Sequence, residues 1–89
     1  MTINTHQLKN EIVQVATTKF PTTVFRRRQL MRAVEARLKE AGAWTDQDDL
    51  LSGSAGIKSR GMAQVDWRIT DLGREHLLLK LARDQWRLP

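Results

Sequence analysis

The first third of the chain has apolar residues at helical spacing. One helix face is made by Leu8, Ile12, Val15 and Ala16. Positions i, i+4, i+7 and i+8 share a face, so the pattern predicts a helix over residues 4–19. Asn4 and Gln7 stand at the two side-chain positions of a capping box. Pro21 ends the helix, because the residue before proline avoids helical backbone angles.

A second helix is predicted over residues 26–41. Its apolar stripe consists of Leu30, Val34, Leu38 and Ala41. Gly42 follows directly and suits the left-handed residue that closes many helices. Between the two helices, residues 22–25 are β-branched or aromatic and favour a short extended segment.

The middle of the chain carries turn and loop signals. Residues 45–51 predict a short helical turn capped by Thr45, with carboxylates at the end of the helix dipole that favours them. Residues 52–61 contain three glycines and three serines, so they predict an irregular loop.

Residues 62–69 alternate in polarity, and every second residue is apolar. The apolar set is Ala63, Val65, Trp67 and Ile69. A period of two predicts a half-buried strand with Trp67 facing inward. Residues 71–85 then predict a third long helix, with Thr70 as its N-cap.

That last helix has more leucine than one small core needs. The excess predicts a homodimer contact through a C-terminal helix, made by Leu78, Leu79 and Trp86.

The chain has 89 residues and no cysteine. This length predicts one domain over residues 1–89, and the lack of thiols excludes disulfides and thiolate metal sites. The chain has no apolar run of the kind found in a signal peptide or a membrane span. We therefore expect a cytoplasmic protein that does not associate with membranes.

The net charge is +5, and its distribution is uneven. Residues 1–43 carry eight basic and three acidic side chains, residues 44–51 carry three acids and no base, and residues 52–61 carry two bases. Excess positive charge in a small domain favours an acidic partner, most often nucleic acid.

The stretch "WRITDLGREHL", residues 67–77, resembles a segment of winged helix-turn-helix regulators of the multiple-antibiotic-resistance and phenolic-acid-repressor types. In those families the last strand of the wing meets the following helix there. Trp67 and Ile69 match the inward strand positions, Thr70 the helix cap, Gly73 a close-approach glycine and Leu77 the first buried helix position. The resemblance implies an α+β fold, mostly helical, with a small β-hairpin wing. It also implies a wing along the DNA backbone and a helix in the major groove.

The chain departs from that family pattern at residues 46–49. The resemblance places the recognition helix after the second helix, where this sequence has the acidic "DQDD". Either that helix is degenerate, or the arginine-rich helix and the glycine-rich loop make the contact. A third alternative is a winged helix that binds protein.

Two basic stretches are the candidate nucleic-acid contacts. "FRRRQLMR" supplies Arg26, Arg27, Arg28 and Arg32, and the loop supplies Lys58, Ser59 and Arg60. Guanidinium groups suit phosphate and guanine, and a glycine-rich basic loop suits a wing tip. The alternative for the arginines is an ordinary solvated surface with ion pairs inside the chain, and the alternative for the loop is a disordered connection. The DNA hypothesis requires the two stretches to share one face.

No catalytic, metal or cofactor motif is present. His6 and His76 each stand alone, and "DQDD" does not meet the calcium-loop pattern. The sequence thus predicts a non-enzymatic transcription regulator that binds double-stranded DNA. The alternatives are an interaction adaptor, or a subunit of a larger complex without direct DNA binding.

Overall fold

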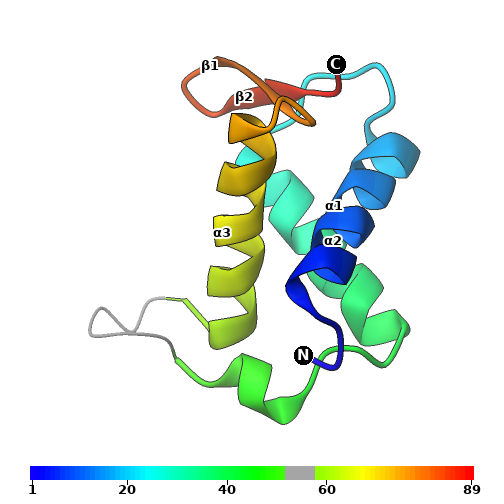
Figure 1. Ribbon diagram of the computed structural model, residues 1–89, viewed down its shortest axis with the longest axis vertical. Helices are drawn as coiled ribbons and strands as arrows, with labels where there is room; N and C mark the ends of the chain where they lie inside the picture. The colour runs from blue at the N-terminus through cyan, green and yellow to red at the C-terminus, as the bar shows by residue number, and fades with distance from the viewer. Residues whose placement is uncertain (52–57) are drawn as a thin grey trace.

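The computed structural model describes residues 1–51 and 58–89. Their order is α1 (Thr5–Lys19), α2 (Arg27–Glu40), the 3-10 helix η1 (Asp46–Asp49), α3 (Arg60–Arg74), β1 (Leu79–Ala82) and β2 (Gln85–Arg87). The fold is therefore α+β, as predicted, with a helical body and one small hairpin. Figure 1 shows the hairpin across one end of the helices and η1 at the other end.

The three helices pack against one another around a single apolar core. Helix α1 contributes Leu8, Ile12, Val15 and Ala16, α2 contributes Leu30, Met31, Val34 and Leu38, and α3 contributes Val65, Ile69 and Leu72. For α1 these are the residues that the helical spacing picked out. For α2 they include Leu30, Val34 and Leu38, whereas Ala41, expected on the same face, is exposed at the end of the helix. The Asn4–Gln7 capping box forms as predicted, with bonds of 2.8 and 2.9 Å. Gly42 follows α2 with a φ of 73°, the left-handed angle expected of it.

The hairpin closes the core at the end where α2 begins. Strands β1 and β2 are antiparallel, and the backbone groups of Phe25 and Trp86 pair on the other side of β2, with bonds of 2.8 and 2.9 Å. The extended segment predicted at residues 22–25 is thus held in place at Phe25. Phe25 and Trp86 are both buried, and the Trp86 ring lies over Gly73.

The strand predicted over residues 62–69 is wrong, because this stretch lies inside α3. Val65, Ile69 and Leu72 are spaced i, i+4 and i+7, and they form the buried face of that helix. Trp67 lies on the opposite face and is 65% exposed rather than buried. Thr70 is accordingly not an N-cap; the α3 cap is Ser59, whose hydroxyl accepts the Met62 N–H at 3.1 Å.

The helix predicted over residues 71–85 is also wrong. Helix α3 ends at Arg74, and the chain turns into the hairpin. The Leu77 N–H donates to the Leu72 carbonyl and the His76 N–H to the Gly73 carbonyl, at 3.0 and 3.2 Å. These two bonds form a Schellman motif that stops the helix. Leu77, expected to be buried, is exposed.

The predicted homodimer contact needs correction for the same reason. The described C-terminal residues form a hairpin rather than a helix, so the proposed helical contact surface does not exist. Leu78 and Trp86 are buried in the chain's own core, and Leu79 is half-buried in β1. Leu78 is thus used within the fold, whereas Leu77 and Leu81 are exposed. No helix in residues 1–51 and 58–89 has the length and apolarity needed to cross a bilayer.

His76 occupies the left-handed position of the Schellman motif, with a φ of 59°. A side chain there is strained, and glycine adopts the same angle without that cost. Replacing His76 with glycine is expected to raise the free energy of unfolding by about 0.5–1 kcal/mol. Chemical denaturation followed by circular dichroism measures the difference. A loss of stability would contradict this account of how α3 ends.

Candidate nucleic-acid interface

An open hollow of about 840 Å³ lies where the first turns of α2 approach the first half of α3 and the hairpin turn. Its lining is Arg26, Arg27, Arg28, Met31, Arg32, Lys58, Ser59, Met62, Asp66, Thr70 and Asp84. Five of these side chains are cations and two are carboxylates. The hollow therefore presents a net positive surface to solvent.

Six of the seven predicted contact residues line this hollow. They are Arg26, Arg27, Arg28, Arg32, Lys58 and Ser59. The two basic stretches, far apart in the sequence, therefore share one face of the molecule. Arg60 is exposed at the start of α3 but does not line the hollow. The rest of the glycine-rich loop, residues 52–57, lies outside the described residues.

Asp66 on α3 lines this hollow and accepts hydrogen bonds from two of its cations. Its Oδ1 accepts from Arg27 Nε at 2.5 Å, and its Oδ2 accepts from the Lys58 ammonium. Burial by itself would raise the pKa of Asp66, but hydrogen bonds from Lys58 and Arg27 outweigh it, so the pKa lies below its usual value. Both predicted DNA contacts are thus engaged with a carboxylate of the same chain.

Arg27 has several further partners. Its Nη2 donates to the Asp66 carbonyl at 2.6 Å and to Thr70 Oγ1 at 2.5 Å. Its backbone N–H, left over at the start of α2, donates to the Asp84 carboxylate at 3.1 Å. The guanidinium carbon also lies 5.4 Å from the centre of the Trp86 ring. Arg27 therefore joins α2, α3 and the hairpin.

The other arginines of α2 in this hollow have no such partners. Arg26, Arg28 and Arg32 are exposed, and none forms an ion pair with another described residue. They lie at the N-cap and on the first two turns of α2. The Arg27 N–H already donates to the Asp84 carboxylate, whereas the N–H groups of Arg28 and Gln29 have no partner within the helix. This arrangement attracts an anion.

The hairpin adds basic residues that the sequence did not single out. Lys80, Arg83 and Arg87 are exposed there, and Arg74 ends α3 beside Lys80. None of the four forms an ion pair within the described residues. They were missed because residues 71–85 were assigned to a helix, which separated these cations from the α2 arginines. Asp84 could have indicated a turn at this position, since aspartate tolerates the left-handed backbone angle that Asp84 adopts.

The acidic element η1 lies at the opposite end of the molecule from the hairpin (Figure 1). Asp48 is 2% exposed and pairs with the Met1 amino group at 2.8 Å, and it accepts from the Thr45 N–H. Burial opposes ionisation of Asp48, but these hydrogen bonds lower its pKa. Asp49 accepts from the Trp44 indole at 2.9 Å. These acids stabilise the fold there, and η1 does not take the place of the third helix.

The outward face of α3 has a mixed character. Trp67 lies there with the exposed Gln64, and Arg68 pairs with Asp71 at 2.9 Å. An indole this exposed contributes little to the core, because most of its surface remains in water. It is therefore available to a partner.

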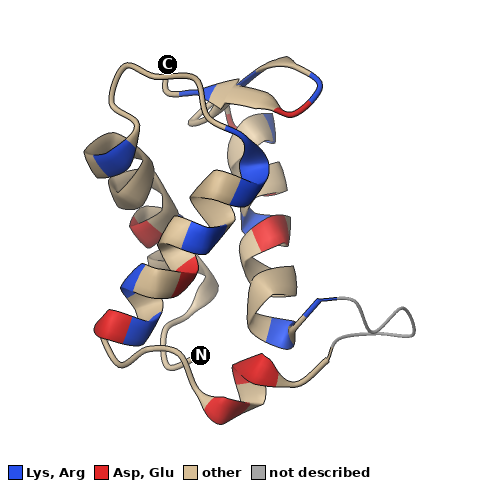
Figure 2. Cartoon of the chain, turned by 180° about the vertical axis from the view of Figure 1, so that it is seen from behind, with Lys and Arg blue, Asp and Glu red and all other residues tan. Residues whose placement is uncertain are grey.

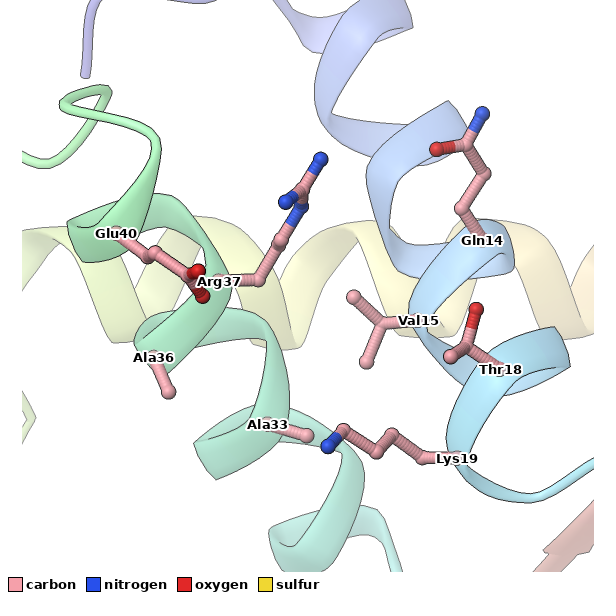
Figure 3. Close-up of a pocket in the computed structure, with 8 residues that line it drawn as sticks. All are labelled: Gln14, Val15, Thr18, Lys19, Ala33, Ala36, Arg37 and Glu40. Atoms are coloured by element: carbon pink, nitrogen blue, oxygen red, sulfur yellow. The ribbon is translucent and has the colours of Figure 1, made fainter.

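A second hollow, of about 570 Å³, lies between α1 and α2 (Figure 3). The small side chains of Ala33 and Ala36 leave this space open, and its charged rim consists of Lys19, Arg37 and Glu40. The rim mixes both signs, and Arg37 already contacts Glu11 at 3.4 Å. It lacks the uncompensated charge of the first hollow.

Figure 2 summarises the charge distribution of the described residues. Basic positions gather on the first half of α2, on the hairpin and at the start of α3, whereas η1 carries acidic positions and the far end of α2 carries both signs. The molecule thus has a basic end and an acidic end.

No family model, curated protein or solved structure matches the chain.

Proposed function

We propose that the chain is a winged-helix protein that binds double-stranded DNA through its basic end. The observation that carries this proposal is the group of exposed arginines Arg26, Arg28 and Arg32, which have no carboxylate partner and stand at a helix N-terminus. Phosphates satisfy both the cations and the free N–H groups of such a site. We propose in addition that it acts as a transcription regulator.

The order of the elements supports the winged-helix assignment. A helix, an extended residue that pairs with the last strand, two further helices and a hairpin follow one another along the chain. The wing is then the hairpin of residues 79–87, in place of the glycine-rich loop. Helix α3 takes the role of the helix that enters the major groove in the families resembled.

The chemistry of the two exposed surfaces suits this arrangement. Arg28 and Arg32 on α2, with Lys80 and Arg83 on the hairpin, are exposed and provide the phosphate contacts. Gln64 on the outward face of α3 has the amide that pairs with adenine in the major groove. Phosphate contacts supply affinity, and the α3 face supplies any preference for sequence.

Replacing Arg28 and Arg32 together with alanine tests the proposal. Two lost phosphate contacts are expected to weaken binding to any duplex about tenfold at 100 mM salt. The slope of log K against log salt is expected to fall by about 1–2. Fluorescence anisotropy with a labelled duplex at several salt concentrations measures both quantities.

The matched control removes two charges from the other half of the same helix. Arg37 pairs with Glu11 and Lys39 with Glu35, so their replacement with alanine removes two cations far from the hairpin. This variant is expected to change affinity less than twofold. Equal losses in both variants would show attraction to net charge alone, and no salt-dependent binding by the unchanged protein would refute the proposal.

A protein-interaction adaptor is the second candidate. The exposed Trp67 favours it, since tryptophan is enriched where partners bind most strongly. An adaptor predicts no salt-dependent response to duplex DNA, so the same titration separates the two functions.

A further inference from the structure

Arg27 and Lys58 share the carboxylate of Asp66 but differ in how firmly they are held. Arg27 has three side-chain hydrogen bonds to α3, and its own backbone N–H donates to Asp84. Its side chain is only 24% exposed. Moving it would break its contacts with Asp66, Thr70 and the Trp86 ring at once, so we regard Arg27 as a fixed clamp between α2 and α3.

Among residues 1–51 and 58–89, Lys58 has one partner, the carboxylate of Asp66. Its side chain is 46% exposed, and its ammonium lines the same hollow as Arg26, Arg28 and Arg32. An exposed ion pair contributes at most about 1 kcal/mol, and a lysine ammonium rotates easily between acceptors. A second anion in the hollow therefore competes for Lys58 on nearly equal terms.

Asp66 does not lose its charge compensation if Lys58 leaves. Its Oδ1 remains bonded to Arg27 Nε, so departure of the ammonium breaks one contact and not both. The exchange thus avoids the large cost of an unpaired buried carboxylate.

We infer that Lys58 transfers from Asp66 to a DNA phosphate when the duplex binds, while Arg27 stays bonded to Asp66. Because Asp66 pairs with Lys58 in the free protein, it lowers the affinity of the basic end for DNA. The inference rests on the proposed function, because the incoming anion is a phosphate of the duplex. It divides the two cations into one structural residue and one ligand-binding residue.

A double-mutant cycle tests the transfer. Asp66→Asn keeps an oxygen acceptor for Arg27 but releases Lys58, so it is expected to raise duplex affinity about fivefold. In the protein that keeps Asp66, Lys58→Ala is expected to weaken duplex binding less than twofold. The contact that Lys58 gains with a phosphate is offset there by the contact that it loses with Asp66. In the Asp66→Asn background the same change is expected to cost about fivefold.

Asp84→Asn is the matched control. Asp84 lines the same hollow, but its carboxylate accepts from a backbone N–H, so its removal releases no cation. It is expected to raise affinity about twofold through charge alone and to show no coupling with Lys58→Ala. If the effects of Asp66→Asn and Lys58→Ala on the binding free energy simply add, as expected for Asp84→Asn, the transfer is refuted while DNA binding stands.

Nuclear magnetic resonance on the unchanged protein provides a test that does not depend on how any variant folds. On addition of duplex, the Lys58 ammonium signal is expected to shift and the Arg27 Nε signal to stay. An unmoved Lys58 signal, or a displaced Arg27 signal, would overturn the inference. Failure of the unchanged protein to bind duplex would instead remove the proposed function and the inference together.

Discussion

Replacing Trp86 with alanine is expected to lower the free energy of unfolding by about 3–5 kcal/mol. Trp86 is 5% exposed, and its backbone pairs with Phe25 on one side and with Lys80 in β1 on the other. Its ring covers Gly73 and lies beside the Arg27 guanidinium. Loss of the ring leaves a cavity where three segments meet, and the surrounding backbone can collapse into it only in part.

Trp67→Ala is the control for this change. The same residue type is removed, but Trp67 is 65% exposed on α3, so the expected loss is below about 0.5 kcal/mol. Urea denaturation followed by far-ultraviolet circular dichroism measures both variants. A chain of this size has a total stability of roughly 4–13 kcal/mol, so the Trp86 variant is expected to unfold at a far lower urea concentration. Similar losses in the two variants would contradict the hairpin's place in the core.

The elements that the sequence predicted correctly are those specified by local signals. Helices α1 and α2 have regular apolar spacing, and their ends are marked by Asn4 with Gln7 and by Gly42. Each signal acts within a few residues, so no knowledge of the rest of the fold was needed. The short turn at η1 was predicted on the same grounds.

The elements that were predicted wrongly had ambiguous patterns. Val65 and Ile69 are four residues apart, a spacing that suits a helix face and also fits an alternating strand. Only Trp67 distinguished the two, and its exposure shows that aromatic character alone does not indicate burial. The leucines after residue 76 fit a helix as well as a hairpin, because the Schellman motif at His76 lacks the usual glycine.

The candidate site was predictable in its cations but not in its contacts. The arginine run at the start of α2 was visible in the sequence, and the structure brings Lys58 beside it. The carboxylate that joins them, Asp66, is 39 residues from Arg27. No local pattern indicates a contact across that separation. The different roles of Arg27 and Lys58 therefore could not be predicted from the sequence.

Replacing Gly61 with alanine is expected to lower the free energy of unfolding by about 2 kcal/mol. A Cβ atom at this position would lie 2.4 Å from the Trp44 indole and 2.8 Å from the Cβ of Asp48. Neither neighbour moves freely, since the indole donates to Asp49 and Asp48 is held by Thr45. Alanine favours a helix over glycine by at most about 1 kcal/mol, which is too little to offset the overlap.

Gly73→Ala is the matched control within the same helix. Its added Cβ would lie 3.1 Å from the Trp86 ring, a contact that a small movement of the ring relieves. The gain in helix preference and the cost of this movement nearly cancel, so the expected change is within about 1 kcal/mol of zero. Urea denaturation again measures both variants. Similar losses in the two variants would contradict the close packing of Gly61 against Trp44 and Asp48.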